Sequence, residues 1–325
     1  METSRLFARK NLAINEIKIY HFPRNSKNIS EGEFFLHKIL EKRQLSYDKE
    51  RDQSVYYFKV EAPEIARNRK AGQFIIFQID DTWGERVPLT IADANAEEGW
   101  IAIVFQTVGA STRKFAAKFN VGDNVPVIVG PLGRPTHIEK KDGLVLCVGG
   151  GIGIAPLHPI VQANHEIGNK VVTIIGARTK ELLFFEDEMK AASDELIVVT
   201  DDGTYGRKAV VTEPLKEICE KEKVSEIVSI GPAIMMKFCV AAARPFGVPI
   251  TTSLNTIMID GTGMCGCCRV SVGGETKFVC VDGPEFDGYK VDFDNMMQRM
   301  TAFKDKEREA DHKCRIGLDA GKVSA

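Results

Sequence analysis

The sequence predicts an antiparallel β-barrel, then an α/β domain built on a parallel sheet, then a small C-terminal module rich in glycine and cysteine. Three observations support this prediction. Residues 35–138 hold short β-rich runs, such as Val55–Val60, which turn residues separate. In residues 139–250, continuous apolar runs such as Leu144–Val148 alternate with helix-like segments, the pattern of βαβ units. Residues 251–290 are too few for a large core, so we expect a metal centre to stabilise this module.

Composition limits the classes of function. A chain of 325 residues with 44% hydrophobic residues can bury several cores of domain size. Its net charge of -2 gives no reason to expect a nucleic acid or an anionic membrane as partner. The N-terminus lacks the apolar segment of a secretory signal, and no run of about 18 apolar residues follows it. We therefore expect a cytoplasmic protein whose partners are small molecules and other proteins.

The two ends of the chain are predicted to lie outside these modules. Residues 1–34 are polar and weakly patterned, and we interpret them as an N-terminal extension. Residues 291–325 are predicted to form a C-terminal helix and a tail, with the helix beginning at Asp292. The apolar side chains of this helix share one face, which indicates packing: Phe293, Met296, Met297, Met300 and Phe303.

A glycine-rich segment at 149–156 follows the apolar run directly and precedes a predicted helix. Glycines at such a turn let the backbone approach a pyrophosphate, whose charge is met by free N–H groups of the helix N-terminus. Pro156 stands where the last glycine of the usual dinucleotide fingerprint would fall, so another nucleotide fold is favoured over a Rossmann domain. The alternative is a tight strand-to-helix turn without a ligand. The residues predicted to contact a nucleotide here are Gly150, Gly151, Gly153, Ile154, Ala155 and Pro156.

Three further strand ends are expected to border the same ligand, because open α/β sheets bind ligands at the carboxyl ends of their strands. Arg178 suits an adenosine ribose or a 2′-phosphate, so NAD(H) and NADP(H) both stay open; its alternative is a solvated loop position. Asp201 and Asp202 suit either the dinucleotide or a turn cap. The predicted residues are Gly176, Ala177, Arg178, Asp201, Asp202, Gly203, Gly231, Pro232 and Met235.

Two segments of the predicted barrel suit a flavin. The first, 86–90, combines an arginine for the phosphates with a hydroxyl and backbone amides for the isoalloxazine edge. The second, 108–113, offers backbone and hydroxyl donors at a predicted helix start. A plain barrel strand followed by a capped helix is the alternative. The candidate residues are Arg86, Val87, Pro88, Leu89, Thr90, Val108, Gly109, Ser111 and Thr112.

Four of the eight cysteines crowd into residues 265–280, and this segment carries the strongest local signal. Cys265 and Cys268 have C-x2-C spacing, which lets two thiolates bind one iron, and Cys280 follows after eleven intervening residues. Plant-type 2Fe-2S loops have a cysteine where this chain has Asp260, so the spacing fits an aspartate ligand. A carboxylate is a harder donor than a thiolate, so such a cluster should differ in potential from an all-cysteine one.

Three alternatives remain for this loop: Asp260 in a turn without a metal, Cys267 as the fourth ligand, and zinc instead of iron. Cys267 lies between two predicted ligands, so its side chain is expected to point away from them. Zinc would need four nitrogen or sulfur ligands, and the nearest histidines, His165 and His312, are far away in sequence. The scattered cysteines are interpreted as core residues or surface thiols: Cys147, Cys219, Cys239 and Cys314.

Together these motifs resemble the small flavin and iron-sulfur subunits of NADH-dependent reduced ferredoxin:NADP oxidoreductase, also described as sulfide dehydrogenase, in the ferredoxin-NADP reductase superfamily. The resemblance covers about residues 35–303. The electron-transfer subunit of dihydroorotate dehydrogenase B is similar too, but it has cysteine where this chain has Asp260. The resemblance rests on the segments 86–93, 149–156, 175–178, 200–203, 260–268 and 280–288.

The resemblance implies a barrel that binds FAD, an α/β domain that binds NAD(H), and a 2Fe-2S cluster on Asp260, Cys265, Cys268 and Cys280. The implied function is hydride exchange between NAD(H) and FAD and single-electron exchange between FAD and the cluster, within a flavin-based electron-bifurcating complex. A larger flavin and iron-sulfur subunit would be the partner, and ferredoxin would be reached indirectly. We predict no catalytic acid or base, because hydride transfer needs close stacking rather than proton transfer.

Two departures from the family leave alternatives open. Residues 1–34 and 304–325 exceed its usual limits, so the chain could serve another oxidoreductase complex, hydrogenase-linked or similar to dihydroorotate dehydrogenase. Ile230 stands where related reductases often have a cysteine beside the nicotinamide. The remaining alternative is a non-catalytic assembly subunit that keeps its cofactors for structure.

Overall fold

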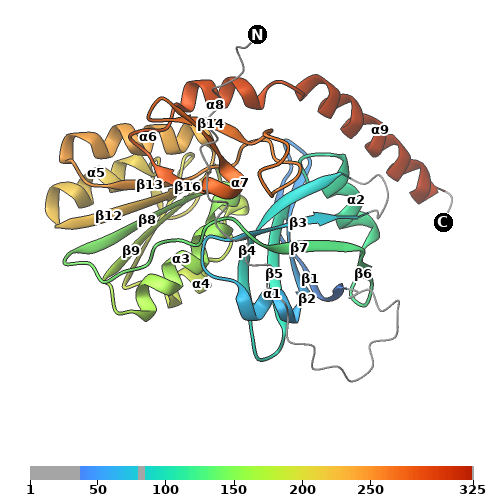
Figure 1. Ribbon diagram of the computed structural model, residues 1–325, viewed down its shortest axis with the longest axis horizontal. Coiled ribbons are helices and arrows are strands. Elements are labelled where there is room, and N and C mark those ends of the chain that lie inside the picture. Colours follow the sequence, from blue (N-terminus) through green and yellow to red (C-terminus); the bar gives the residue numbers. More distant parts are fainter. Residues whose placement is uncertain (1–36, 80–84, 324–325) are drawn as a thin grey trace, which may run out of the picture. The chain divides into compact units, whose positions relative to one another are not determined.

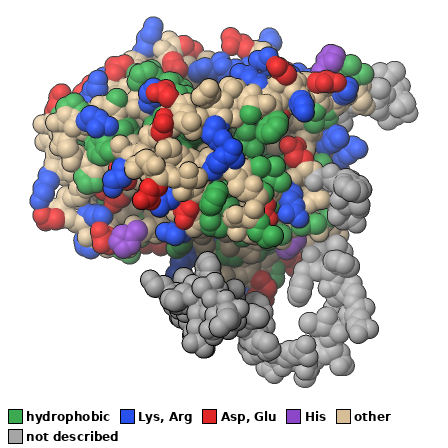
Figure 2. All heavy atoms as spheres, turned by 45° about the horizontal axis from the view of Figure 1, so that its top comes forward, with side chains coloured by type: hydrophobic (Ala, Val, Ile, Leu, Met, Phe, Trp, Pro, Cys, Tyr) green, Lys and Arg blue, Asp and Glu red, His purple; other side chains and the backbone are tan. Residues whose placement is uncertain are grey.

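The computed structural model describes residues 37–79 and 85–323, with backbone only from 318 onward (Figure 1). The predicted N-terminal extension, residues 1–34, lies outside the described residues. The described strands form two seven-stranded sheets and one two-stranded sheet. No helix in the described part of the chain combines the length and the apolar character needed to cross a membrane. On the face that Figure 2 displays, basic and acidic side chains are interspersed.

The first seven-stranded sheet forms the predicted antiparallel barrel. Its strand order is β6-β1-β2-β5-β4-β3-β7. Only Pro126 separates the two edge strands, so one continuous stretch of chain pairs with β1 on one side and with β3 on the other. The sheet therefore closes on itself. Its elements are β1 (His37–Asp48), β2 (Gln53–Glu61), α1 (Pro63–Asn68), β3 (Phe74–Gln78), β4 (Arg86–Asn95), β5 (Trp100–Gln106), α2 (Ala110–Lys118), β6 (Asn124–Val125) and β7 (Val127–Leu132).

Alternate residues of β3 contribute to two different cores, because successive side chains of a strand point to opposite faces. Ile75 and Phe77 are buried inside the barrel, where the ring of Phe77 lies 4.7 Å from that of Phe115 on α2. Phe74 and Ile76 point outward and join the core of the α/β domain and the cysteine-rich module. The barrel and the C-terminal module thus share buried apolar surface.

The second seven-stranded sheet is parallel, as predicted, except for its last strand. The order is β11-β10-β9-β8-β12-β13-β16, and only β16 runs antiparallel to its neighbour. The predicted boundary between residues 250 and 251 falls inside β13. The elements are β8 (Leu144–Gly150), the 3-10 turn η1 (Gly151–Gly153), α3 (Ile154–Glu166), β9 (Val171–Ala177), η2 (Lys180–Leu182), α4 (Glu186–Ala191), β10 (Glu195–Thr200), β11 (Arg207–Lys208), α5 (Thr212–Lys221), β12 (Val224–Ile230), α6 (Ala233–Ala243), η3 (Arg244–Phe246) and β13 (Ile250–Ser253).

The C-terminal part confirms the helix start at Asp292 but corrects its length. The Asp292 carboxylate accepts a hydrogen bond from the N–H of Asn295 at 3.0 Å and caps α8. The helix ends at Met300, so Phe303 lies beyond it, 48% exposed, and the predicted apolar stripe is wrong at this residue. A second helix, which the sequence did not predict, follows. The elements are β14 (Arg269–Val272), β15 (Glu275–Phe278), α7 (Val279–Asp282), β16 (Glu285–Asp287), α8 (Phe293–Met300) and α9 (Lys304–Val323).

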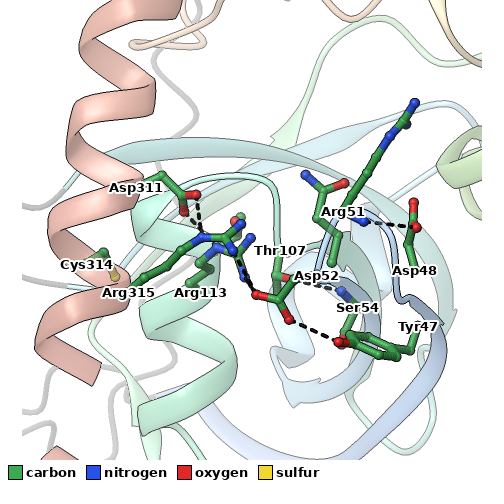
Figure 3. Close-up of polar contacts among 12 residues, drawn as sticks. Tyr47, Asp48, Arg51, Asp52, Ser54, Thr107, Arg113, Asp311, Cys314 and Arg315 are labelled. Atoms are coloured by element: carbon green, nitrogen blue, oxygen red, sulfur yellow. Dashed lines mark hydrogen bonds and ion pairs between the residues drawn. The ribbon is translucent and has the colours of Figure 1, made fainter. Parts of the chain in front are cut away.

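Ion pairs attach the unpredicted helix α9 to α2 and to the β1–β2 hairpin (Figure 3). The Arg113 guanidinium of α2 donates to Asp311 at 2.7 Å. Arg315 donates to Asp52 of the hairpin at 2.9 Å. The Cys314 thiol, which is buried, faces the carbonyl of Ala110 at 3.6 Å. Cys147 and Cys239 are buried as well and Cys219 is half-buried, in line with the interpretation of the scattered cysteines.

Candidate functional site

A cavity of about 770 Å³ lies between the α/β sheet and the barrel. Its α/β wall is formed at the carboxyl ends of four strands, β8, β9, β10 and β12, and by the start of α6. The predicted nucleotide residues in its lining are Gly150, Gly151, Gly176, Ala177, Arg178, Asp201, Pro232 and Met235. Topology brings these residues together, because the carboxyl ends of parallel strands meet at one edge of a sheet.

The turn from β8 into α3 depends on two glycines. Gly151 has a φ of 53°, a left-handed conformation that favours glycine, and a Cβ atom there would meet no atom within 4 Å. Its backbone is therefore open to a ligand. A Cβ atom on Gly153 would lie 2.4 Å from the carbonyl oxygen of Ile230, so only glycine allows the turn to approach β12 this closely.

The rest of the glycine-rich segment contributes differently. Ile154 and Ala155 begin α3, and their side chains are buried in the core. Of the residues predicted in this segment, the cavity lining leaves out Gly153, Ile154, Ala155 and Pro156. The first turn of α3 therefore supports the site from behind.

The two aspartates after β10 have separate roles. Asp201 lines the cavity, where burial raises the pKa of its carboxyl while Arg178 opposes the rise. Asp202 is exposed and accepts hydrogen bonds from the N–H of Thr204 at 2.9 Å and from its hydroxyl at 2.7 Å. Asp202 therefore caps a turn, which was one of its two predicted roles. Neither Gly203 nor Gly231 belongs to the cavity lining.

The barrel supplies a cavity wall that the sequence did not predict. The Ser46 hydroxyl is buried and has no hydrogen-bond partner among the described residues, although it lines the cavity. A buried donor without a partner is costly, so a polar ligand group is expected beside it. Gln53 and Gln106 line the cavity next to each other, with a hydrogen bond of 3.1 Å between their side chains. Their signal in the sequence is an uncharged polar residue within a strand, which is too common to single them out.

The predicted flavin residues lie on β4 and at the start of α2, outside the lining of this cavity. Arg86 donates to the side-chain oxygen of Gln78 at 3.4 Å. The Thr112 hydroxyl donates to the Gly109 carbonyl at 3.0 Å and accepts from the Gly109 N–H at 3.2 Å, as in the capped-helix alternative. The Ser111 hydroxyl donates to the Glu85 carboxylate. The remaining candidates Val87, Pro88, Leu89 and Thr90 are half-buried on β4, and Val108 is exposed.

Two of the predicted cluster ligands form a buried pair. The sulfur atoms of Cys268 and Cys280 lie 3.3 Å apart, and the N–H of Cys280 points at the Cys268 sulfur from 3.5 Å. Burial raises the pKa of the Cys280 thiol to about 12, and the neighbouring Cys268 adds to this effect. Two sulfur atoms this close, with an amide donor beside them, suit two thiolate ligands of one iron-sulfur cluster.

The other two predicted ligands lie on the exposed part of the loop. The Asp260 carboxylate accepts from the N–H and hydroxyl of Thr262 at 2.9 and 2.6 Å and from the N–H of Met264 at 3.1 Å. These bonds, those of Thr262 first, and the charge of Arg86 lower the pKa of Asp260. The N–H of Cys267 lowers the pKa of the Cys265 thiol. These three hydrogen bonds to Asp260 all go to one oxygen, Oδ2, as in the turn alternative.

No three His, Cys, Asp or Glu side chains converge on a metal-binding position among those that the structure describes, in residues 37–79 and 85–317. The four predicted ligands lie on one module, and only Cys268 and Cys280 among them form a close pair. Backbone amides nevertheless face the sulfur atoms of Cys265 and Cys268, and this donor chemistry fits an iron-sulfur cluster. The loop also packs on the barrel, because Gly261, with a φ of 81°, approaches β3 and β7: a Cβ atom there would lie 2.9 Å from Ile76 and 3.0 Å from Leu132.

Comparison with known proteins supports an iron-sulfur module in this part of the chain. Residues 255–292, which contain all four predicted ligands, match the iron-sulfur cluster binding domain of dihydroorotate dehydrogenase B. Over 273 residues the chain is 45% identical to the dihydroorotate dehydrogenase B (NAD(+)) electron transfer subunit homolog of Thermotoga maritima, covering 84% of this chain and 93% of that protein. This chain belongs to the family of dihydroorotate dehydrogenase B electron-transfer subunits. A subunit from Desulforamulus reducens is 32% identical over 244 residues, 73% of this chain and 92% of that protein.

Solved structures place this electron-transfer subunit in the predicted fold class. A chain from a structure of NADH-dependent reduced ferredoxin-NADP oxidoreductase, described in connection with flavin-based electron bifurcation, superposes with a TM-score of 0.79. It is 44% identical, and the match covers 87% of this chain and 99% of that chain. The predicted resemblance is thereby confirmed. A cytochrome P450 reductase from Amycolatopsis, 21% identical with a TM-score of 0.53 over 65% of this chain and 66% of that one, shares the fold alone.

Proposed function

We propose that this electron-transfer subunit exchanges a hydride between NAD(H) and a bound FAD, and single electrons between that FAD and a 2Fe-2S cluster. The observation that carries the proposal is the cavity of about 770 Å³, because residues at four strand ends of the α/β sheet face residues of the barrel across it. A dinucleotide needs such a site, with glycine backbone for its pyrophosphate and the barrel wall near its reactive end.

Different residues of the cavity are proposed to bind different parts of the dinucleotide. The open backbone of Gly151 is available to the pyrophosphate, and the first turn of α3 holds this glycine turn in place from behind. Asp201 is available to accept a hydrogen bond from a ribose hydroxyl, and the Ser46 hydroxyl, which lacks a partner among the described residues, to bond a polar group of the ligand. No side chain needs to move a proton, because hydride transfer depends on how closely the two rings are held.

The barrel residues are proposed to hold the flavin. Arg86 would pair with its phosphates, and the turn at Gly109, Ser111 and Thr112 would supply donors at the N-terminus of α2. When bound, FAD supplies the chemistry that converts two-electron into one-electron transfer. The influence of Arg86 on the Asp260 carboxyl supports a flavin site close to the cysteine loop.

Asp260, Cys265, Cys268 and Cys280 are proposed as the cluster ligands. Since the three hydrogen bonds to Asp260 all use Oδ2, its other oxygen, Oδ1, can bind iron while the turn holds the carboxylate in place. An oxygen ligand is harder than sulfur, so the potential of this cluster is expected to differ from that of an all-cysteine one.

The partner is proposed to be a larger flavin and iron-sulfur subunit. This larger subunit would exchange electrons with ferredoxin, so that the present chain contacts ferredoxin only indirectly. The 44% identical chain supports this assignment, because its structure concerns flavin-based electron bifurcation. The second candidate function is electron transfer within a dihydroorotate dehydrogenase complex, which the name of the Thermotoga maritima relative favours. Identifying the large subunit that co-purifies with the native protein decides between the two.

Cofactor analysis tests the proposal. After anaerobic reconstitution of the full chain, we expect one FAD, two iron and two acid-labile sulfide per chain. Zinc as the sole bound metal, or protein that takes up no flavin, would refute it.

A further inference from the structure

An ion pair in the cavity wall joins the barrel to the α/β domain. Arg178, directly after β9, donates through Nη2 to the carboxylate of Asp48 at the end of β1. Its Nη1 lies 3.4 Å from the carboxylate of Glu50. Asp48 and Arg178 both line the cavity, with side chains 5% and 37% exposed. The cation that could meet a phosphate is therefore already paired.

The turn after β1 fixes the carboxylate of Asp48. Its Oδ1 accepts from the N–H of Glu50 at 3.1 Å. It also accepts from the N–H of Arg51 at 3.2 Å (Figure 3). Its Oδ2 takes the Arg178 guanidinium. Since both oxygens are engaged and the side chain is buried, releasing Arg178 would leave a buried carboxylate without its cation, which is costly.

We propose that Asp48 is a specificity-determining residue that keeps the 2′-phosphate of NADP(H) out of this cavity. The inference rests on the proposed function, because that function brings a ribose to Asp201 in the cavity that Arg178 also lines. A 2′-phosphate adds up to two negative charges; it would compete with Asp48 for Arg178 and would lie near Glu50 and Asp201. A 2′-hydroxyl is neutral and can donate to a carboxylate such as Asp201.

The Asp48→Asn variant tests this inference. Asparagine keeps an oxygen for the two backbone N–H groups but lacks the charge that holds Arg178. The probes are 5′-AMP and 2′,5′-ADP, which differ only in the 2′-phosphate, and their binding to the full chain is measured by calorimetry. We expect 2′,5′-ADP to bind the variant about tenfold more tightly than the wild type, and the affinity for 5′-AMP to change less than about threefold.

Two further variants control the experiment. Asp52→Asn changes a carboxylate of the same hairpin, 57% exposed, that pairs with Arg315 and lies outside the cavity lining, so both affinities should stay at wild-type values. Adding Arg178→Gln to the Asp48→Asn variant should remove the gain for 2′,5′-ADP, because the gain depends on the freed guanidinium.

Two results would overturn the inference while leaving the proposed function in place: an unchanged ratio of the two affinities in Asp48→Asn, or a wild type that prefers 2′,5′-ADP. Failure of the wild type to bind 5′-AMP at millimolar concentration would remove the dinucleotide site itself, and the inference with it.

Discussion

Replacing Glu285 with glutamine is expected to stabilise the protein above neutral pH. Glu285 is half-buried on β16, and its carboxyl accepts a hydrogen bond from the Thr136 hydroxyl at 2.6 Å. Burial raises the pKa of Glu285 from 4.5 to about 7; the bond from Thr136 opposes the rise and the charge of Glu226 adds to it. The folded protein thus holds this carboxyl in its neutral form over a wide range of pH.

The sign and size of the effect follow from the two pKa values. Between pH 4.5 and about 7 the folded state binds more protons than the unfolded state, so the free energy of unfolding falls as the pH rises through this window. A shift of about 2.5 units at 1.36 kcal/mol per unit gives a loss of about 3 kcal/mol by pH 8. Glutamine cannot ionise, and its oxygen still accepts from Thr136, so the variant should avoid this loss.

Thermal unfolding at pH 5 and pH 8 measures the difference. The variant should melt above the wild type at pH 8, and the gap should be roughly 6 °C wider there than at pH 5. Glu97→Gln, on the exposed turn between β4 and β5, is the matched control and should show no such widening. An equal difference in melting temperature at both pH values would mean that the pKa of Glu285 is not raised in the folded protein, and the prediction would be wrong.

Three other substitutions test the site and the C-terminal helix. Cys268→Ser should abolish the absorption of the reconstituted cluster whereas Cys219→Ser keeps it; retention of the cluster in Cys268→Ser would exclude this ligand. Gly153→Ala should weaken NAD(H) binding at least about tenfold in a fluorescence titration, because the added Cβ atom would lie 2.4 Å from a backbone oxygen of β12; unchanged affinity would show that this turn does not shape the site. Asp311→Ala takes one partner from Arg113, whose side chain is 10% exposed, and should cost about 2 kcal/mol in urea unfolding; a loss below about 0.5 kcal/mol would mean that this ion pair does not hold α9.

Sequence patterns predicted the parts of the fold that local chemistry determines. The apolar runs at β8, β9, β10 and β12 and the glycines after β8 predict a parallel sheet whose strand ends meet at one edge, and the structure contains this sheet and a cavity at that edge. The helix start at Asp292 could be predicted because the capping bond joins residues only three positions apart, from the N–H of Asn295 to the Asp292 carboxylate.

The parts that were not predicted depend on contacts between distant segments. Helix α9 is highly charged, and its attachment rests on pairs such as Arg113 with Asp311, nearly 200 residues apart, which no local period reveals. The barrel wall of the cavity was missed for the same reason: Asp48 acquires its role only when the fold brings Arg178 to it. Likewise, only the folded chain separates the two aspartates, because Asp202 bonds the N–H of Thr204 while Asp201 belongs to the cavity lining.

An anaerobic titration of the reconstituted full chain with NADH, followed by absorption and electron paramagnetic resonance, tests whether electrons pass from NADH through the flavin to the cluster. We expect NADH to bleach the flavin absorption, and the signal of a reduced 2Fe-2S cluster to grow in the same titration. A protein that holds both cofactors but whose flavin stays oxidised under excess NADH would rule out electron transfer from NADH and favour an assembly role for this subunit.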